Sequence, residues 1–319
     1  MEELDATAYL APPDLEAQLR DELEDVTAVH GRLLIAPGPP RNALWAQNVW
    51  LQPLRIPILS IADGARKLRS IQRNWALYPF QLRRRAELIQ AQLPHVSAKP
   101  LEFPAPAPKA PLGSWTLIDE GTILASPACT SPFPNGEASF VEHKEGPPSR
   151  AYQKLWEALT LLGRWPAAGE RCLDAGASPG SWTWALARLG ARVLAVDRAP
   201  LDPAIAAMEG VECRQASAFS LQPPRDGPFD WIFCDVVCYP ERLLQWVRRW
   251  AGSGLAGNFV CTVKFQGKDH YGAIDGFAAL PGSRMVHLWH NKHELTWMLA
   301  RDPKAPDPKY PVQAQKGAP

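Results

Sequence analysis

Arg171-Cys-Leu-Asp-Ala-Gly-Ala-Ser-Pro-Gly180 is the segment from which the architecture of this chain is most readily inferred. Its apolar start predicts a strand over 171–175, and a helix is expected to begin near Trp182. Glycines at a turn from strand to helix let a ligand approach the backbone, and the amino end of the helix attracts a negative group. The segment therefore predicts half of a nucleotide-binding unit.

Strands and helices alternate on both sides of this segment. Further strands are expected at 191–197, 211–214, 229–234, 258–264, 284–289 and 294–300, and helices at 149–162, 202–208 and 240–251. This alternation is typical of an α/β fold with a mainly parallel, Rossmann-like sheet that carries helices on both faces. The last two strands are joined by a short turn at 290–293, so we expect an antiparallel hairpin at the edge of the sheet.

The second predicted strand ends in an acid, Asp197, which lies 23 residues after Asp174. An acid at this position can accept hydrogen bonds from both ribose hydroxyls of an adenosine. The dinucleotide spacing G-x-G-x-x-G is absent, since Gly176, Ser178 and Gly180 occupy the turn. The turn therefore favours S-adenosylmethionine, whose negative end is a carboxylate, over NAD. A tight structural turn without a ligand is the alternative.

The chain before residue 149 has a different character. Residues 1–96 mix short strands with helices and predict a small α+β domain. Residues 97–148 are expected to form a proline-rich linker followed by a hairpin with strands at 115–119 and 122–126. The domain over 149–301 follows, and the proline-rich, polar residues 302–319 are expected to be disordered.

Charge is unevenly distributed in a chain whose formal net charge is only +1. Residues 1–27 carry nine acids and one base, whereas residues 50–90 carry eight bases and two acids. The eight bases are Arg55, Arg66, Lys67, Arg69, Arg73, Arg83, Arg84 and Arg85. This basic region is either a phosphate-binding face or a pair of solvated helix faces.

The rest of the composition is ordinary for a soluble globular protein, with 46% hydrophobic and 21% charged residues. The six cysteines are scattered and have no histidine at zinc-ligand spacing, so no metal site is expected. Acids crowd the start of the chain, and no apolar run reaches the length of a membrane span. We therefore expect a cytoplasmic protein, with a monomer favoured.

Lys264 ends the apolar run 258–264, where a lysine is costly to bury unless it is paired or used in chemistry. Lys154, Asp235 and Glu294 also lie at the edge or end of predicted elements. Together they indicate a site that can remove a proton from an alcohol. Taken singly, Lys154 has a plain alternative as a solvated helix residue, and Glu294 as a surface charge on a strand.

Four segments in this order resemble the FtsJ-type ribose 2′-O-methyltransferases. They are Ser149-Arg-Ala-Tyr-Gln-Lys-Leu155, Asp174-Ala-Gly-Ala-Ser-Pro-Gly-Ser-Trp182, Cys234-Asp-Val-Val237 and Val263-Lys-Phe-Gln-Gly267. The resemblance covers about residues 125–300 and is closest to the RlmM group, which modifies a cytidine of bacterial 23S rRNA. It implies an S-adenosylmethionine-dependent methyltransferase sheet and an RNA substrate, with ribosomal RNA as the expected partner.

The resemblance also implies roles for individual residues. Lys264 would be the base acting on the 2′-hydroxyl, Asp235 and Lys154 would orient and tune it, and Glu294 would hold the lysine or the ribose. The residues expected to contact the cofactor are Asp174, Gly176, Ser178, Pro179, Gly180, Trp182, Asp197, Ser217 and Asp235. Ser217 stands where the family usually carries an acid near the adenine amino group.

Two other functions remain open at this point. A catalytically silent RNA-binding protein could keep the same fold, although the intact lysines and acids argue against it. A small-molecule O-methyltransferase would commonly use a metal or a histidine base, and His287, His290 and His293 lie on the expected edge hairpin. Residues 1–96 would be a diverged THUMP-like RNA-binding region.

Overall fold

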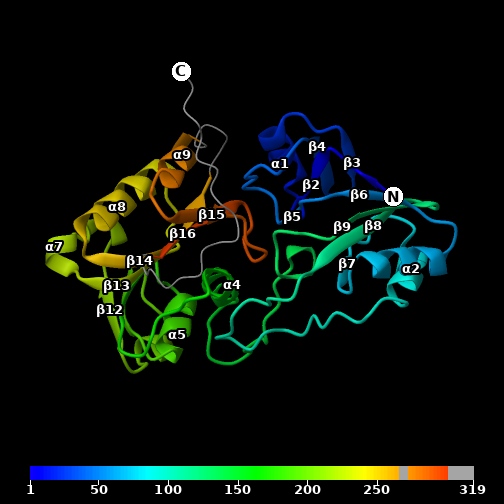
Figure 1. Ribbon diagram of the computed structural model, residues 1–319. Coiled ribbons are helices and arrows are strands. Elements are labelled where there is room, and N and C mark those ends of the chain that lie inside the picture. The colour runs from blue at the N-terminus through cyan, green and yellow to red at the C-terminus, as the bar shows by residue number, and fades with distance from the viewer. Residues whose placement is uncertain (266–271, 301–319) are drawn as a thin grey trace, which may run out of the picture.

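The computed structural model describes residues 1–265 and 272–300, and these residues form three β-sheets. A sheet of seven strands, in the order β12-β11-β10-β13-β14-β16-β15, is built by the second half of the chain. Sheets of four strands (β3-β4-β2-β5) and five strands (β1-β6-β9-β8-β7) are built by residues before 127. Figure 1 shows the seven-stranded sheet on one side of the molecule and the two smaller sheets, in blue to green, on the other.

The seven-stranded sheet confirms the expected Rossmann-like α/β fold. Its strands are β10 (Arg171–Ala175), β11 (Arg192–Asp197), β12 (Val211–Gln215), β13 (Phe229–Cys234), β14 (Ala256–Lys264), β15 (Ser283–Val286) and β16 (Glu294–Ala300). Strands β10 to β14 pair in parallel, whereas β16 is antiparallel to both of its neighbours. The hairpin is thus present at the edge, and its second strand inserts between β14 and β15.

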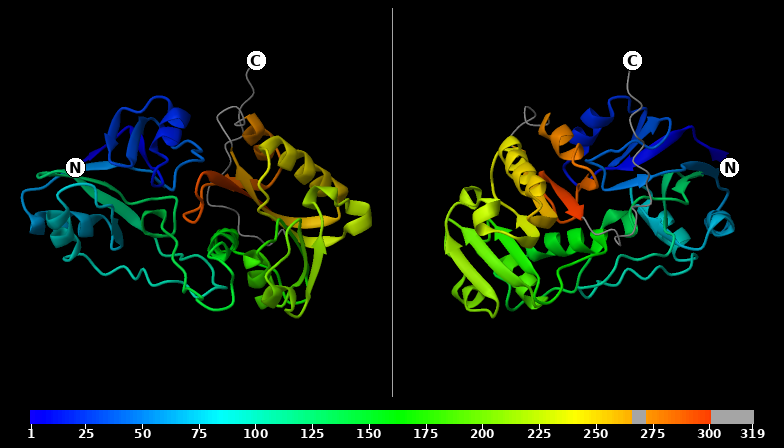
Figure 2. Two further views of the ribbon diagram at one scale, coloured as in Figure 1. Left: turned by 180° about the vertical axis from the view of Figure 1, so that it is seen from behind. Right: turned by 60° about the vertical axis from the view of Figure 1, so that its left-hand side comes forward.

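Helices cover both faces of this sheet because its strands bury side chains on both sides. The helices are α4 (Tyr152–Leu162), α5 (Ser181–Arg188), α6 (Pro203–Ala206), α7 (Pro223–Asp226), α8 (Pro240–Ser253) and α9 (Gly272–Ala278). Cys172 and Trp231 pack with residues of α4 and α5, whereas the alternate residues Leu173 and Ile232 pack with residues of α8 and α9. Figure 2 shows these green and yellow-to-orange helices on opposite faces.

The first half of the chain places its helices on one side of each small sheet. Its elements are β1 (Glu2–Glu3), β2 (Ala6–Leu10), α1 (Glu16–Leu23), β3 (Ala28–His30), β4 (Leu33–Pro37), β5 (Asn48–Trp50), β6 (Leu54–Pro57), α2 (Ile61–Ile71), β7 (Trp75–Leu77), α3 (Arg83–Gln90), β8 (Gly113–Asp119) and β9 (Thr122–Ser126). Helices α2 and α3 pack on the five-stranded sheet through Leu68 and Ile89, which are fully buried with Trp115 and Ile123.

The hairpin of β8 and β9 belongs to this first region and not to a linker. Both strands lie in the interior of the five-stranded sheet, where β9 pairs with β6 and β8 pairs in parallel with β7. The five-stranded sheet therefore extends past the boundary that we expected at residue 96. The sequence pattern identifies the hairpin but not its partners, because β7 and β8 are separated by a long proline-rich connection. Residues 302–319 lie outside the described residues.

A loop of the first region touches the seven-stranded sheet near the end of β14. The backbone N–H of His287 donates to Leu44 O at 3.1 Å, and the ring of Trp45 lies 5.8 Å from that of Phe265. Glu22 holds this loop by accepting hydrogen bonds from the backbone N–H groups of Leu44 and Trp45. The first region is thereby anchored next to the residue that follows Lys264.

Replacing the buried indole at the centre of the five-stranded sheet tests the place of the hairpin. We expect Trp115→Ala to lower the free energy of unfolding of the first region by about 3–5 kcal/mol, because a fully buried side chain leaves a cavity. Urea unfolding followed by circular dichroism measures this change. Leu59→Ala, at a side chain 93% exposed, is the control and should change little. A Trp115→Ala protein as stable as the wild type would contradict the assignment.

Candidate active site

Four charged side chains meet at the carboxyl edge of the seven-stranded sheet. Asp235 directly follows β13, Lys264 ends β14, and Glu294 begins β16 opposite Lys264 in the antiparallel register. Lys154 comes from the first turn of α4. Parallel strands end at the same edge, and an antiparallel neighbour begins there. The insertion of β16 next to β14 therefore brings together residues that are 140 positions apart.

The four side chains form a continuous chain of alternating charge. Lys264 Nζ lies 2.9 Å from Asp235 Oδ1 and donates to the backbone oxygen of Asp235 at 2.7 Å. Lys154 Nζ lies 3.6 Å from the same Oδ1 and donates to Glu294 Oε1 at 2.7 Å. The lysine that Glu294 contacts is thus Lys154. The sequence analysis had left open whether Glu294 holds the lysine or the ribose.

Burial makes these contacts strong. The side chains of Lys154 and Glu294 are 10% and 13% exposed, whereas those of Lys264 and Asp235 are about one-fifth exposed. Charges that are mostly withdrawn from water interact more strongly than surface pairs, and each needs a partner to remain ionised. The more open pair, Lys264 and Asp235, is therefore the part of the chain of charges that a substrate can reach.

Glu157 is a positioning residue that the sequence analysis did not identify. It is buried on α4, and its carboxylate accepts hydrogen bonds from the backbone N–H groups of Trp289 and His290 at 2.8 and 3.0 Å. The connection from β15 to β16, which leads into Glu294, is thereby tied to the helix that carries Lys154. Glu157 lies three residues after Lys154, so both side chains are on one face of α4. This spacing is the sequence feature from which Glu157 could have been identified.

The turn after β10 approaches the loop that carries Asp235. Gly176 has a φ of +83°, and a Cβ atom there would lie 2.7 Å from Val236 Cγ2. Gly180 has a φ of +119° and immediately precedes α5. A side chain at residue 176 would separate the two loops. This glycine therefore lets the turn over residues 174–180, named here the cofactor turn for the ligand expected from the sequence, contact Val236, the residue after Asp235.

Asp197 and Ser217 lie side by side at the same edge. The carboxylate of Asp197 accepts hydrogen bonds from the backbone N–H groups of Ser178 and Ala199, at 3.1 and 2.9 Å. Its backbone oxygen accepts from Ala216 N at 2.8 Å, next to Ser217. Ser217 precedes the short 3₁₀ helix η2 (Ala218–Ser220). The structure thus brings the expected ribose and adenine positions together.

Pro179 and Trp182 occupy different surroundings within the same turn. The backbone oxygen of Pro179 accepts from Asp202 N at 3.0 Å, which joins the turn to α6. Trp182 is buried in the core, and its indole N–H donates to Ala151 O at 2.9 Å. Its ring meets that of Phe233 edge-on. Trp182 therefore packs in the core and supports α5. It does not face the solvent side of the turn, where the sequence analysis expected it to contact the cofactor.

Asp174 supplies an observation that fits S-adenosylmethionine. Its side chain is buried, Oδ2 accepts a hydrogen bond from Thr183 Oγ1 at 2.6 Å, and Oδ1 has no hydrogen-bond partner among the described residues. Burial raises the pKa of Asp174 to about 7. A buried acid with one unpaired oxygen suits an ammonium group, such as that of the amino-acid end of this cofactor. The turn and α5 could hold its carboxylate, and Asp197 its ribose.

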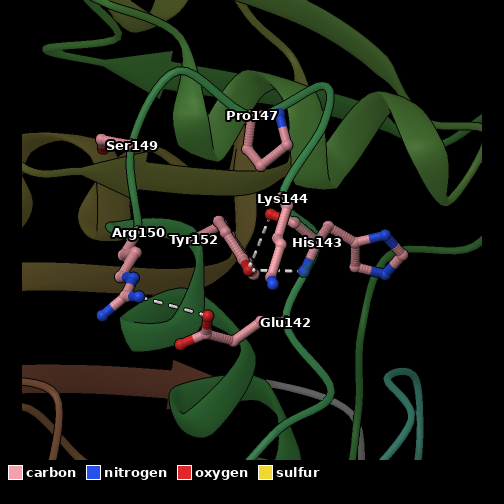
Figure 3. Close-up of a pocket in the computed structure, with 7 residues that line it drawn as sticks. All are labelled: Glu142, His143, Lys144, Pro147, Ser149, Arg150 and Tyr152. Carbon is pink, nitrogen blue, oxygen red and sulfur yellow. Dashed lines mark hydrogen bonds and ion pairs between the residues drawn. The ribbon is translucent and has the colours of Figure 1, made fainter.

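A hollow of about 310 Å³ lies at the start of α4 (Figure 3). Its lining residues are Glu142, His143, Lys144, Pro147, Ser149, Arg150 and Tyr152. Ser149 Oγ lies 2.7 Å from the hydroxyl of Ser181, the first residue of α5. The hollow thus borders the cofactor turn. It is formed by an irregular loop, whose shape no sequence pattern predicts.

Within residues 1–265 and 272–300, no group of three or more His, Cys, Asp or Glu side chains is arranged to hold a metal ion. Over the same residues, no helix combines the length and the apolar character that crossing a membrane requires. The six cysteines are free thiols.

Comparison with known proteins confirms the resemblance for this part of the chain. Residues 147–269 match the family model of the FtsJ-like methyltransferases. A protein of Aromatoleum aromaticum named ribosomal RNA large subunit methyltransferase M is 36% identical over 168 residues, which are 48% of this chain and 45% of the relative. A protein of the same name from Halorhodospira halophila is 43% identical over 159 residues, 47% of this chain and 46% of the relative.

The chain spans about half the length of these curated relatives. Among solved structures, TrmN from Thermus thermophilus is 14% identical with a TM-score of 0.34, and the match covers 92% of this chain and 99% of that protein.

The raised pKa of Asp174 predicts a pH-dependent stability. Between the ordinary pKa of an aspartate, about 4, and about 7, the folded protein keeps a proton that the unfolded chain has lost. The titration of Asp174 therefore lowers the free energy of unfolding as the pH rises from about 4 to about 7. Below about pH 4 this titration does not change the free energy of unfolding. As the pH rises through this range, we expect the free energy of unfolding of Asp174→Asn to increase relative to that of the wild type by up to about 1.4 kcal/mol per pH unit.

Urea unfolding at a series of pH values without cofactor measures this difference. The exposed Glu209→Gln variant is the control and should follow the wild type. A difference between Asp174→Asn and wild type that is the same at pH 4 and pH 7 would contradict the titration of Asp174.

Proposed function

We propose that this protein transfers the methyl group of S-adenosylmethionine to a ribose 2′-hydroxyl of ribosomal RNA, with a cytidine of 23S rRNA as its target. The observation that carries the proposal is the chain of contacts from Glu294 through Lys154 and Asp235 to Lys264. It lies at the edge of the sheet where the cofactor turn meets the Asp235 loop. The names of the relatives support ribosomal RNA as the substrate.

The chemistry requires alignment and the removal of one proton. A ribose hydroxyl is a weak nucleophile, and the cofactor, when bound, supplies a reactive methyl group on sulfur. Lys264 Nζ, in its uncharged form, accepts the proton of the 2′-hydroxyl. Asp235 stabilises the ammonium that results, because its Oδ1 already lies 2.9 Å from this nitrogen.

Lys154 and Glu294 orient the acid in this proposal. Lys154 lies 3.6 Å from Asp235 Oδ1 and is itself fixed by Glu294. Two cations share one carboxylate, and their contacts from two sides hold Asp235 in its direction. Each of the four residues thus has a partner in the chain of charges, which a catalytically silent protein would not need to maintain.

The first region is the proposed RNA-binding part. Within its basic residues, Arg66 and Lys67 pair with Asp63, and Arg83 pairs with Glu87. Arg84 is exposed in the first turn of α3, directly after Arg83. Residues 1–96, extended by the β8–β9 hairpin, would hold RNA, and residues 149–301 would carry out the transfer.

Lys264→Ala tests the assignment of the base. We expect methyl transfer to unmodified ribosomal RNA to fall about 10²–10⁴-fold, because proton removal is lost, while cofactor affinity is retained. Transfer of a labelled methyl group, followed by mapping of the modified nucleotide, measures activity and names the target. Lys292→Ala, at an exposed lysine on the connection before β16, is the matched control. Turnover of Lys264→Ala near the wild-type rate would refute the base assignment.

Arg84→Glu tests the RNA-binding face. We expect weaker RNA binding, because one contact to phosphate is lost. The slope of the logarithm of the binding constant against the logarithm of salt concentration should fall by about one. Titration of RNA at several salt concentrations measures both. Arg192→Glu, an exposed arginine at the amino edge of β11, makes the same charge change away from the proposed site and should have a smaller effect. Equal effects of the two variants would show that only net charge matters.

A further inference from the structure

The loop between β13 and α8 exposes two large apolar side chains beside the charged chain. Val237 is 72% exposed and Tyr239 is 53% exposed. The other exposed large apolar side chains of the described chain lie within residues 1–141. Among the described residues after 141, Val237 and Tyr239 are therefore the large apolar side chains exposed to solvent, and they follow Asp235 by two and four residues.

Hydrogen bonds hold this loop at both ends. The backbone N–H of Asp235 donates to Ala175 O at 3.1 Å, and its backbone oxygen accepts from Lys264 Nζ. The backbone oxygen of Tyr239 accepts from the N–H groups of Arg242 and Leu243 in the first turn of α8. The backbone of the loop that carries Tyr239 is thus held at both of its ends.

Two cations flank the loop. Burial raises the pKa of Cys238 to about 11, and the nearby charges of Arg242 and Lys264 act in the opposite direction. Arg242 also lies 4.3 Å from the centre of the Phe219 ring, on the side of the sheet edge where Ser217 lies. Lys264 and the exposed Arg242 are therefore both near Cys238, the residue between Val237 and Tyr239.

We propose that Tyr239 and Val237 form the binding platform for the base of the nucleotide whose 2′-hydroxyl is methylated. This inference rests on the proposed function and deepens it. The ribose must reach Lys264, so its base lies near the loop that also supplies Asp235. An aromatic ring offers a stacking surface to an unpaired base, and neighbouring cations suit the phosphates on either side. The target nucleotide is therefore bound unstacked from its RNA neighbours.

A double-mutant cycle between protein and RNA tests this contact. The substrates are a short RNA containing the mapped target nucleotide and the same RNA with an abasic ribose at that position. We expect the wild type to act on the intact RNA with a kcat/KM about tenfold or more above that on the abasic RNA, as stacking of one base predicts. Tyr239→Leu should lose most of this preference, and Tyr239→Phe should keep it.

The affinity for S-adenosylmethionine, measured by calorimetry, should be the same in all three proteins and shows that the variants are folded. Equal base preference in wild type and Tyr239→Leu would overturn the platform while leaving the proposed function intact. Absence of methyl transfer to any RNA by the wild type would overturn the proposed function, and the platform with it. A preference lost in Tyr239→Phe as well would assign the effect to the hydroxyl and refute stacking.

Discussion

The carboxylate of Asp235 lies between two ammonium groups, and the site depends on this arrangement. Its Oδ1 is 2.9 Å from Lys264 Nζ and 3.6 Å from Lys154 Nζ. Charges at this depth are stable only when paired, so the acid and both lysines require each other. Because they come from β13, β14 and α4, their pairing also holds these elements at one edge of the sheet.

The cofactor turn and the charged chain are physically joined. Gly176 has no side chain, which lets the turn after β10 pack against Val236, the residue that follows Asp235. Asp174, whose Oδ1 is buried and unpaired, lies in β10 just before this turn, and the carboxylate of Asp197 accepts a hydrogen bond from Ser178 within it. Methyl donor and base would thus be positioned by two loops in direct contact, which suits a reaction that depends mainly on alignment.

Local patterns predicted much of this architecture. The apolar strands, the glycine turn and the charged residues at strand ends identified the Rossmann-like sheet and the four residues that the structure brings together. Glu157 was missed, since an acid in a helix resembles a solvated charge until the backbone groups that it binds are known. The sequence likewise did not predict that the β8–β9 hairpin pairs with β6 and β7, because the pairing of β7 with β8 spans a long connection.

Residue type and spacing alone specified which side chains end each strand and where the backbone must turn tightly. These are local properties, governed by the period of a strand and by the freedom of glycine. Only the folded chain established that β16 inserts beside β14, which of the two lysines Glu294 contacts, and that Trp182 faces the core. Those features depend on contacts between residues far apart in sequence, and no local pattern carries that information.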